Sequence, residues 1–296
     1  MKQAKKLFYL TLALSMGLLC ASCGGDKGSN GTALGGGKAS PDDYFSWLGS
    51  NIAGLSDKGA AAANIVVPAS AEAVNITITE NDAIKSFSFE DPNANVTTLV
   101  LNYCTALESV SLPTTVASVN CAECPALTSV TIPEGVPALA EGAFHGCSAL
   151  AEITLPESIT VVPEAAFGQC TGLTTVTLPD TITEIDRDAF LSCTSLTSLD
   201  FPAGLKTIDQ GAFHGCRALT SVTLPEGLES IAYDAFGMCD DLVTVKLPES
   251  VTKIDESAFM KAGTEGQEPF AFQVKAGSWA DENSDYFSLS GTVTTY

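Results

Sequence analysis

Basic residues are scarce in this chain of 296 residues. Lysine and arginine together number 14 against 35 aspartates and glutamates, so the net charge at pH 7 is −21. An acidic surface repels phosphate backbones and anionic lipid headgroups, which argues against nucleic acid as a partner and against membrane docking through protein charge. The apolar fraction of 45 % is nevertheless large enough for a substantial core.

Sequence motifs of catalysis are absent as well. The chain contains no GxSxG elbow, phosphate-binding P-loop, dinucleotide fingerprint or HExxH motif. Its carboxylate pairs all lie in repeated or linker contexts, which disfavours a hydrolase that works with carboxylates alone, such as a glycosidase. We therefore expect no enzyme, no catalytic residue, no cofactor and no metal site.

Only two histidines are present, and both lie in the string Phe-His-Gly-Cys. His145 and His214 share one position of a repeat, three units apart, so strand spacing separates them by roughly 14 Å. A metal ion that bonds nitrogen at about 2.0–2.1 Å cannot bridge that distance. Other units hold Gly, Leu or Met at this position, which indicates that the histidines are incidental to the repeat.

The N-terminal apolar run, residues 7–19, is short for a bilayer span, but three lysines precede it as in a secretory signal. It ends in LLCASCGG, which resembles the lipobox of bacterial lipoproteins, with Cys20 where Leu or Val is usual. The resemblance implies a signal peptide over 1–22 and a lipid on Cys23 as the only contact with the membrane. Ordinary signal cleavage nearby is the alternative. The Gly-rich residues 23–40 predict a flexible tether.

A cap of degenerate repeats is expected over residues 41–95. The stretch SPDDYFSW predicts a short helix over about 41–49, because Ser40 can cap it and Pro41 suits its first position. From Ile65 to Phe89 the pattern is that of strands.

A repeat of 23 residues follows. The pattern Cys-x-x-Leu-x-x-Val-x-Leu-Pro recurs seven times with minor variation, and from Cys124 onward the step is constant. A fixed period of this length predicts a solenoid of stacked coils. The residues that recur at this step form the expected core ladder: Cys124, Cys147, Cys170, Cys193, Cys216, Cys239, Phe144, Phe167, Phe190, Phe213, Phe236 and Phe259.

One unit predicts how each coil is built. Alternate residues of 173–178 are apolar and predict a strand, which Pro179 ends. A second inward stretch follows over 182–185, and Asp186 can cap a short helical turn that directs Phe190 inward. The sequence therefore predicts parallel strands joined through short helical turns.

These units resemble the BspA-like, Treponema-type leucine-rich repeats, whose elements are LxxIxLP, LxxI and AFxxC. The resemblance covers residues 96–262 and implies a leucine-rich repeat solenoid. Residues 263–296 lack the repeat, and we expect a C-terminal cap in which Phe270, Phe272 and Trp279 cover the open end.

The family resemblance also implies a function. It points to a non-catalytic adhesion lipoprotein at the outer membrane or cell surface of a Gram-negative bacterium, which binds a host matrix or surface protein as a monomeric domain. A glycan-binding accessory lipoprotein of a saccharide-uptake system is the alternative.

The cysteines could bring other chemistry. Cys121 and Cys124 form a CxxC pair, which can be a disulfide or a metal or redox site, but Cys121 also stands where other units carry the core Phe. Stacked cysteines are close enough for disulfides, yet their Cβ atoms point the same way. We predict buried free thiols that act as small apolar groups.

Two exposed columns are candidates for binding. The residue after each repeat proline is acidic in five units of six, so neighbouring carboxylates form either Ca²⁺ ligands or a solvated edge. This acidic column is Glu134, Glu157, Asp180, Ala203, Glu226 and Glu249.

The second column lies on the outer side of the main strands. It resembles the row through which leucine-rich repeats usually meet ligands, although threonine is also common on any exposed sheet. The candidate ligand face is Thr131, Thr154, Thr177, Asp200, Thr223 and Lys246.

Overall fold

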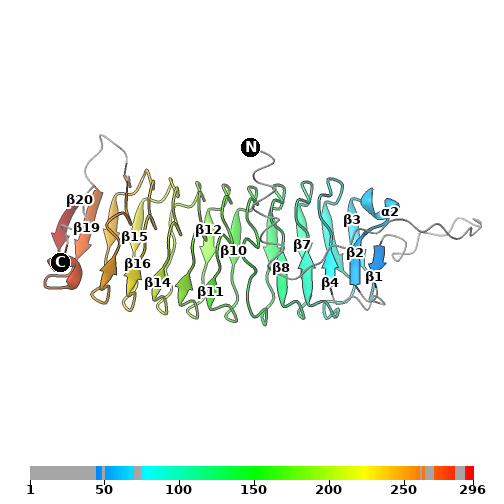
Figure 1. Ribbon diagram of the computed structural model, residues 1–296, viewed down its shortest axis with the longest axis horizontal. Coiled ribbons are helices and arrows are strands. Elements are labelled where there is room, and N and C mark those ends of the chain that lie inside the picture. The colour runs from blue at the N-terminus through cyan, green and yellow to red at the C-terminus, as the bar shows by residue number, and fades with distance from the viewer. Residues whose placement is uncertain (1–44, 49–50, 70–74, 261, 264–269, 284–290) are drawn as a thin grey trace, which may run out of the picture. The chain divides into compact units, whose positions relative to one another are not determined.

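The computed structural model describes residues 45–48, 51–69, 75–260, 262–263, 270–283 and 291–296, which belong to one compact unit over 39–296. This unit is a solenoid in which two series of short strands follow one another from coil to coil (Figure 1). The expected signal peptide over 1–22, the lipidated Cys23 and the tether over 23–40 lie outside the described residues.

The first series carries the main strand of each repeat. Its strands form three sheets, within which neighbours pair in parallel, and in the central coils the register advances by one repeat, as from Glu152 to Thr175. The strands of this series are β3 (Asn64–Val67), β5 (Ser86–Phe89), β7 (Ser109–Ser111), β9 (Ser129–Thr131), β10 (Glu152–Thr154), β12 (Thr175–Thr177), β15 (Ser221–Thr223), β17 (Thr244–Lys246), β19 (Phe270–Val274) and β20 (Gly291–Thr295).

The second series comes from the LxxI part of each repeat and has shorter strands in the regular coils. Its strands form two sheets, within which neighbours pair in parallel except β1 and β2, which pair antiparallel. Its strands are β1 (Phe45–Leu48), β2 (Asn51–Leu55), β4 (Asn75–Thr77), β6 (Thr98–Val100), β8 (Ser118–Asn120), β11 (Val161–Val162), β13 (Glu184–Ile185), β14 (Thr207–Ile208), β16 (Ser230–Ile231) and β18 (Lys253–Ile254). Two single-turn helices, α2 (Asp57–Ala60) and α3 (Trp279–Glu282), flank the repeats.

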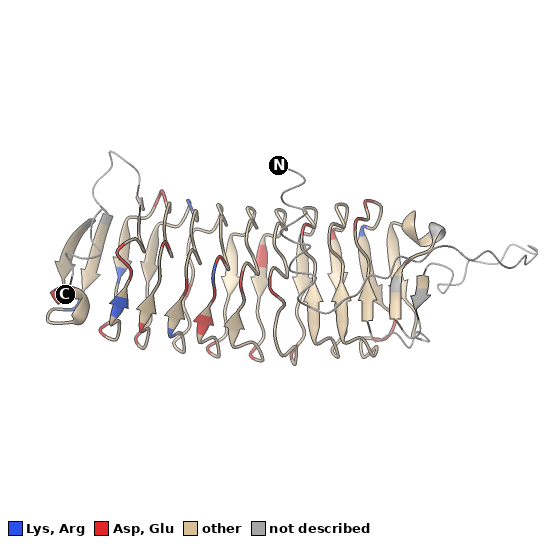
Figure 2. Cartoon of the chain, in the orientation of Figure 1, with Lys and Arg blue, Asp and Glu red and all other residues tan. Residues whose placement is uncertain are grey.

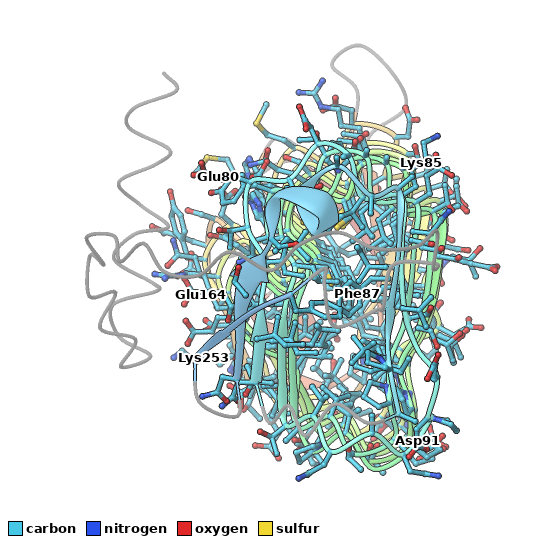
Figure 3. All side chains as sticks on the ribbon, turned by 90° about the vertical axis from the view of Figure 1, so that its right-hand side faces the viewer. Glu80, Lys85, Phe87, Asp91, Glu164 and Lys253 are labelled. Carbon is cyan, nitrogen blue, oxygen red and sulfur yellow. The ribbon has the colours of Figure 1, made fainter. Side chains whose placement is uncertain are left out.

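The interior between the two series is a stack of identical apolar side chains. Seen along the solenoid, Phe87 lies between the strand layers (Figure 3). From Phe144 to Phe259 the six repeat phenylalanines stack with ring centroids 5.1–5.7 Å apart and planes within 12° of parallel. These rings are almost fully buried, because each coil covers the apolar side chains of the next, as expected for a solenoid.

The expected short helical turns are absent from the AFxxC segments that the structure describes. Each segment is instead a run of hydrogen-bonded turns, and from residue 142 to residue 238 each coil has two residues in the left-handed region, such as Ala165 (φ 54°) and Gln169 (φ 59°). A left-handed residue interrupts an α-helix, because its Cβ approaches the following carbonyl oxygen. The turns also connect neighbouring coils, because Phe167 N–H donates to the Ala189 oxygen of the next coil.

The short helix expected over 41–49 is wrong in its described part. Phe45–Leu48 form β1, which pairs with β2 across residues 49–50, and Phe45 is buried. Local capping signals were overridden by the sheet edge that β2 offers. Both series already run in register through β2 to β9, while the domain boundary at residue 95 stays a prediction.

The C-terminal segment adds strands to the solenoid. β19 pairs in parallel with β17, and β20 pairs in parallel with β19. Phe272 is buried and meets Phe259 edge to face at 5.0 Å, and Trp279 is half-buried against the same core. The side chain of Phe270 lies outside the described residues.

Candidate binding surface

The candidate ligand residues form a row along the first series of strands. Thr154 of β10 lies directly beside Thr177 of β12, and Thr223 of β15 lies beside Lys246 of β17. Asp200 falls in a stretch without a strand, where Phe201 replaces the usual Leu and packs on the Phe213 ring at 5.5 Å. The side chains of the row are exposed, apart from the half-buried Lys246.

A second row runs parallel to the first and was missed in the sequence, although the alternation of a strand could have found it. It lies two residues earlier in each coil, on the same side of the strands. This row is Ser109, Ser129, Glu152, Thr175, Ser198, Ser221 and Thr244. The two rows together, which we call the Ser/Thr face, offer mostly short hydroxyl side chains.

Charge is sparse on the Ser/Thr face. Its only charged members are Glu152, Asp200 and Lys246, and Figure 2 shows that most charged residues lie in turns. The outer side of β11, β13, β14, β16 and β18 differs, and Figure 3 places Glu164 and Lys253 on that side, away from Lys85. This charged face is made of Glu164, Glu184, Asp186, Arg187, Asp209 and Lys253.

Carboxylates of the charged face lie close enough to affect one another. Burial raises the pKa of Asp186 to about 6, with smaller contributions from the neighbouring carboxylates of Glu184 and Asp209. Arg187 forms an ion pair with Glu164 of the preceding coil. The raised pKa of Asp186 therefore comes first from burial and then from the like charges beside it on the charged face.

An aromatic residue lies at the C-terminal end of the Ser/Thr face, where sequence spacing gave no reason to expect one. The Lys246 ammonium lies 4.5 Å from the centroid of the Tyr296 ring, and the Tyr296 hydroxyl donates to the Leu247 carbonyl at 3.3 Å. Tyr296 follows β20, so the parallel pairing of β17, β19 and β20 brings it there.

The two histidines belong to separate local contacts. His145 Nδ1 lies 3.3 Å from Glu123 Oε1, and His214 Nδ1 lies 2.8 Å from Asp234 Oδ2. Gly168, one coil after His145, leaves room for the imidazole ring, since a Cβ there would lie 2.9 Å from His145 Cδ2. Among the described residues, no group of three or more His, Cys, Asp or Glu side chains could hold a metal ion.

The cysteine ladder is buried, and the eight described cysteines are all free thiols. Each thiol in the regular coils donates to a carbonyl of the preceding coil, as Cys193 Sγ does to the Phe167 oxygen at 3.2 Å. Burial raises the pKa of Cys170 and of Cys216 to about 12, so both stay protonated at neutral pH. Thiolate chemistry is therefore disfavoured there.

Cys121 takes the place of a core Phe, as its position in the repeat predicted. Its N–H donates to the Ala143 oxygen, as the N–H of Phe144 does to Ala166, and its carbonyl accepts from Cys147 Sγ at 3.2 Å. Cys124 Sγ instead contacts the Leu101 oxygen at 2.9 Å. The CxxC spacing thus reflects two different core positions.

The acidic column lies in exposed turns beyond the main strands. One of its members, Glu249, forms an ion pair with Lys275 of the following coil. Within the described part of the chain, these carboxylates belong to no group able to hold a metal ion.

The repeated interior and the two series of parallel strands define a leucine-rich repeat solenoid. The chain belongs to the BspA type leucine rich repeat family: the model of that repeat region matches residues 59–151 and 138–264, in six copies. None of the curated proteins compared with the chain matches it. No helix in the described part is long and apolar enough to cross a membrane.

Solved structures of similar fold come from several bacteria. The pneumococcal vaccine antigen PcpA is 18 % identical, with a TM-score of 0.53 over 79 % of this chain and 67 % of its own. A leucine-rich repeat protein of T. pallidum is 24 % identical (TM-score 0.40, 62 % and 85 %). A leucine-rich cell surface protein of Faecalibacterium prausnitzii is 20 % identical (TM-score 0.46, 90 % and 95 %). At these identities, the likeness to PcpA supports the fold alone.

Proposed function

We propose that this chain is a non-catalytic binding protein of the bacterial cell surface, whose Ser/Thr face contacts a macromolecular ligand. The observation that carries the proposal is the pair of exposed rows fixed by parallel pairing, as in Thr154 beside Thr177. Solenoids present extended surfaces of this kind, and a long regular face suits a long ligand better than a small molecule.

Rigidity supports a binding role for this face. The side chains are short and their strands are fixed by the stacked interior, so binding immobilises few rotatable bonds and loses little conformational entropy. Each coil also presents its hydroxyls about 4.8 Å from those of the next coil, which repeats the same hydrogen-bonding groups along the solenoid.

Surface display is part of the proposal and depends on the N-terminal sequence. The lysines, the apolar run over 7–19 and the lipobox-like LLCASCGG favour export and lipidation of Cys23. A lipid there would hold the chain at the outer membrane of a Gram-negative cell, with the Gly-rich tether giving the solenoid reach. Adhesion to a host protein or to a glycan would follow from such a position.

A binding screen with the purified full chain tests the proposal. Immobilised host matrix proteins and polysaccharides serve as probes, and two arginines placed by Thr154→Arg and Thr177→Arg obstruct the Ser/Thr face. We expect this double variant to lose binding by at least tenfold, because two long charged side chains cover the hydroxyls of neighbouring coils.

The matched control places the same two side chains directly before strands β11 and β13 of the second series. Thr160 and Thr183 are exposed in the same two coils, so Thr160→Arg with Thr183→Arg changes charge and stability comparably. Binding should survive in this control. Equal loss in both double variants, or ligand binding by neither the parent nor the control, would contradict a role for the Ser/Thr face.

A further inference from the structure

The ring of Tyr296 is held in place on the Ser/Thr face and yet remains open to solvent. Its backbone N–H donates to the Val274 oxygen at 3.0 Å, its hydroxyl donates to the Leu247 oxygen at 3.3 Å, and the Lys246 ammonium lies over the ring. The residue still exposes 51 % of its surface. A ring fixed at both ends loses little freedom when a ligand stacks on it.

The surroundings of this ring are polar and offer several kinds of hydrogen-bonding group. The row that contains Thr223 and Lys246 continues to Gln273 of β19 and Thr294 of β20. Burial and, to a lesser degree, the Glu226 carboxylate raise the pKa of Tyr296, so its hydroxyl remains a donor at neutral pH. Hydroxyl, amide and ammonium groups thus border one aromatic ring.

Neither charge nor apolar area at this end selects another kind of partner. The nearby Lys275 is paired with Glu249, and the Lys246 ammonium lies over the Tyr296 ring, so neither is an isolated positive charge that would select an anionic ligand. The other exposed large apolar side chains of the described residues, Val66, Tyr233, Val243 and Met260, are scattered and provide no apolar patch of the kind that protein interfaces bury at their centre.

We propose that Tyr296, Lys246 and Gln273 form a subsite for one sugar unit of a neutral, linear polysaccharide that extends along the Ser/Thr face. A pyranose ring presents C–H groups that stack on an aromatic face and hydroxyls that bond to polar side chains around it. An extended β-linked chain advances by about 5 Å per sugar, close to the spacing of successive coils. The inference rests on the proposed function and specifies its ligand.

Affinity gel electrophoresis of the full chain tests the subsite, with a soluble β-linked glucan, mannan or xylan in the gel. We expect retardation by at least one of these polymers, and an affinity about tenfold lower for Tyr296→Ala. Tyr296→Phe keeps the ring and should bind within about threefold of the parent. The matched control is Tyr233→Ala, because Tyr233 is 49 % exposed but lies away from the Ser/Thr face.

A second variant tests the subsite without changing any residue next to β20. Lys246→Met alters the subsite from β17 and leaves β20 untouched, and it should also weaken retardation, because the ammonium is lost as a donor to sugar hydroxyls. The subsite is refuted if no polymer retards the parent chain, or if Tyr296→Ala and Tyr233→Ala bind equally.

The outcomes also separate this inference from the proposed function. Binding only to an immobilised matrix protein, abolished by the Thr154 and Thr177 arginine variant, would keep the proposed function and refute the sugar subsite. Polysaccharide binding that needs Tyr296 but tolerates those arginines would support the subsite and refute the extended face.

Discussion

The two outer faces of the solenoid share one interior but differ in the chemistry that they show to solvent. On the Ser/Thr face, hydroxyl side chains repeat from coil to coil, as in Thr154 and Thr177, with few charges. On the charged face, equivalent positions vary from Glu184 to Thr207 to Lys253. Both faces are equally fixed by the stack beneath them, so the uniform composition of one face is not required by folding.

The change that should disturb both faces most is the loss of a shared ring. Phe190 is fully buried and stacks on Phe167 at 5.4 Å and on Phe213 at 5.2 Å. Phe190→Ala should lower the free energy of unfolding by about 3–5 kcal/mol, because a cavity opens between two rings. Urea denaturation measures it, and a loss below about 1 kcal/mol would show that the coils do not depend on the ring stack.

A smaller change concerns the turn that leads from one face to the other. Ala165 is left-handed (φ 54°), where a Cβ is strained and glycine is not. Ala165→Gly should raise the free energy of unfolding by about 0.5–1 kcal/mol, measured by thermal melting. Its neighbour Ala166 is buried and outside that region, so Ala166→Gly should destabilise the protein. The same sign for both variants would contradict the turn geometry.

The two faces should differ in how much they contribute to the pH dependence of stability. The pKa of Asp186 is about 6 in the folded protein and 3.8 in its ordinary state, so the folded chain holds this proton more tightly. The stability that Asp186 contributes is therefore present in full below about pH 4 and is lost as the pH rises through about 6.

Melting temperatures between pH 4.5 and 7.5 measure this contribution. Relative to the parent, Asp186→Asn should remove part of the loss of stability on raising the pH. Asp180→Asn deletes a charge from the same coil at an exposed turn and serves as the control. Parallel pH profiles for the parent and Asp186→Asn would show that the crowding of carboxylates on the charged face is unimportant.

The smallest effect is expected on the Ser/Thr face. Thr177 is exposed and makes no contribution to the interior, so Thr177→Ala should change the free energy of unfolding by less than about 0.5 kcal/mol. Urea denaturation alongside Phe190→Ala checks the contrast between outer and inner residues. A cost above about 1.5 kcal/mol would mean that the hydroxyl rows are structural and were retained for stability.

Much of the fold could be predicted because the same apolar core positions recur in every repeat unit. The period placed Phe144 and its counterparts in one column, and the alternation within 173–178 separated inner from outer residues, as the family match and strand pairing support. The two rows of the Ser/Thr face could be predicted only from the alternation of inward and outward side chains along each strand. The second row, which contains Thr175, was available from the same rule and was overlooked.

The sequence misled where a local signal competed with a distant one. Caps around Ser40 suggested a helix, but Phe45–Leu48 pairs with β2. A cap at Asp186 suggested another, but left-handed residues such as Asp188 (φ 56°) break it so that each coil can bond to the next. Capping contributes about 1 kcal/mol, which is less than a coil gains from its neighbours by burial and hydrogen bonding.

By itself, the sequence determined the repeat, the apolar interior and the uneven distribution of charge, because these depend on residue type and spacing alone. Tertiary structure decided which distant residues meet. Tyr296 reaches the carbonyl of Leu247, 49 positions away, only because β17, β19 and β20 pair in parallel. No local pattern encodes that contact, since it follows from the register of strands that pack two coils apart.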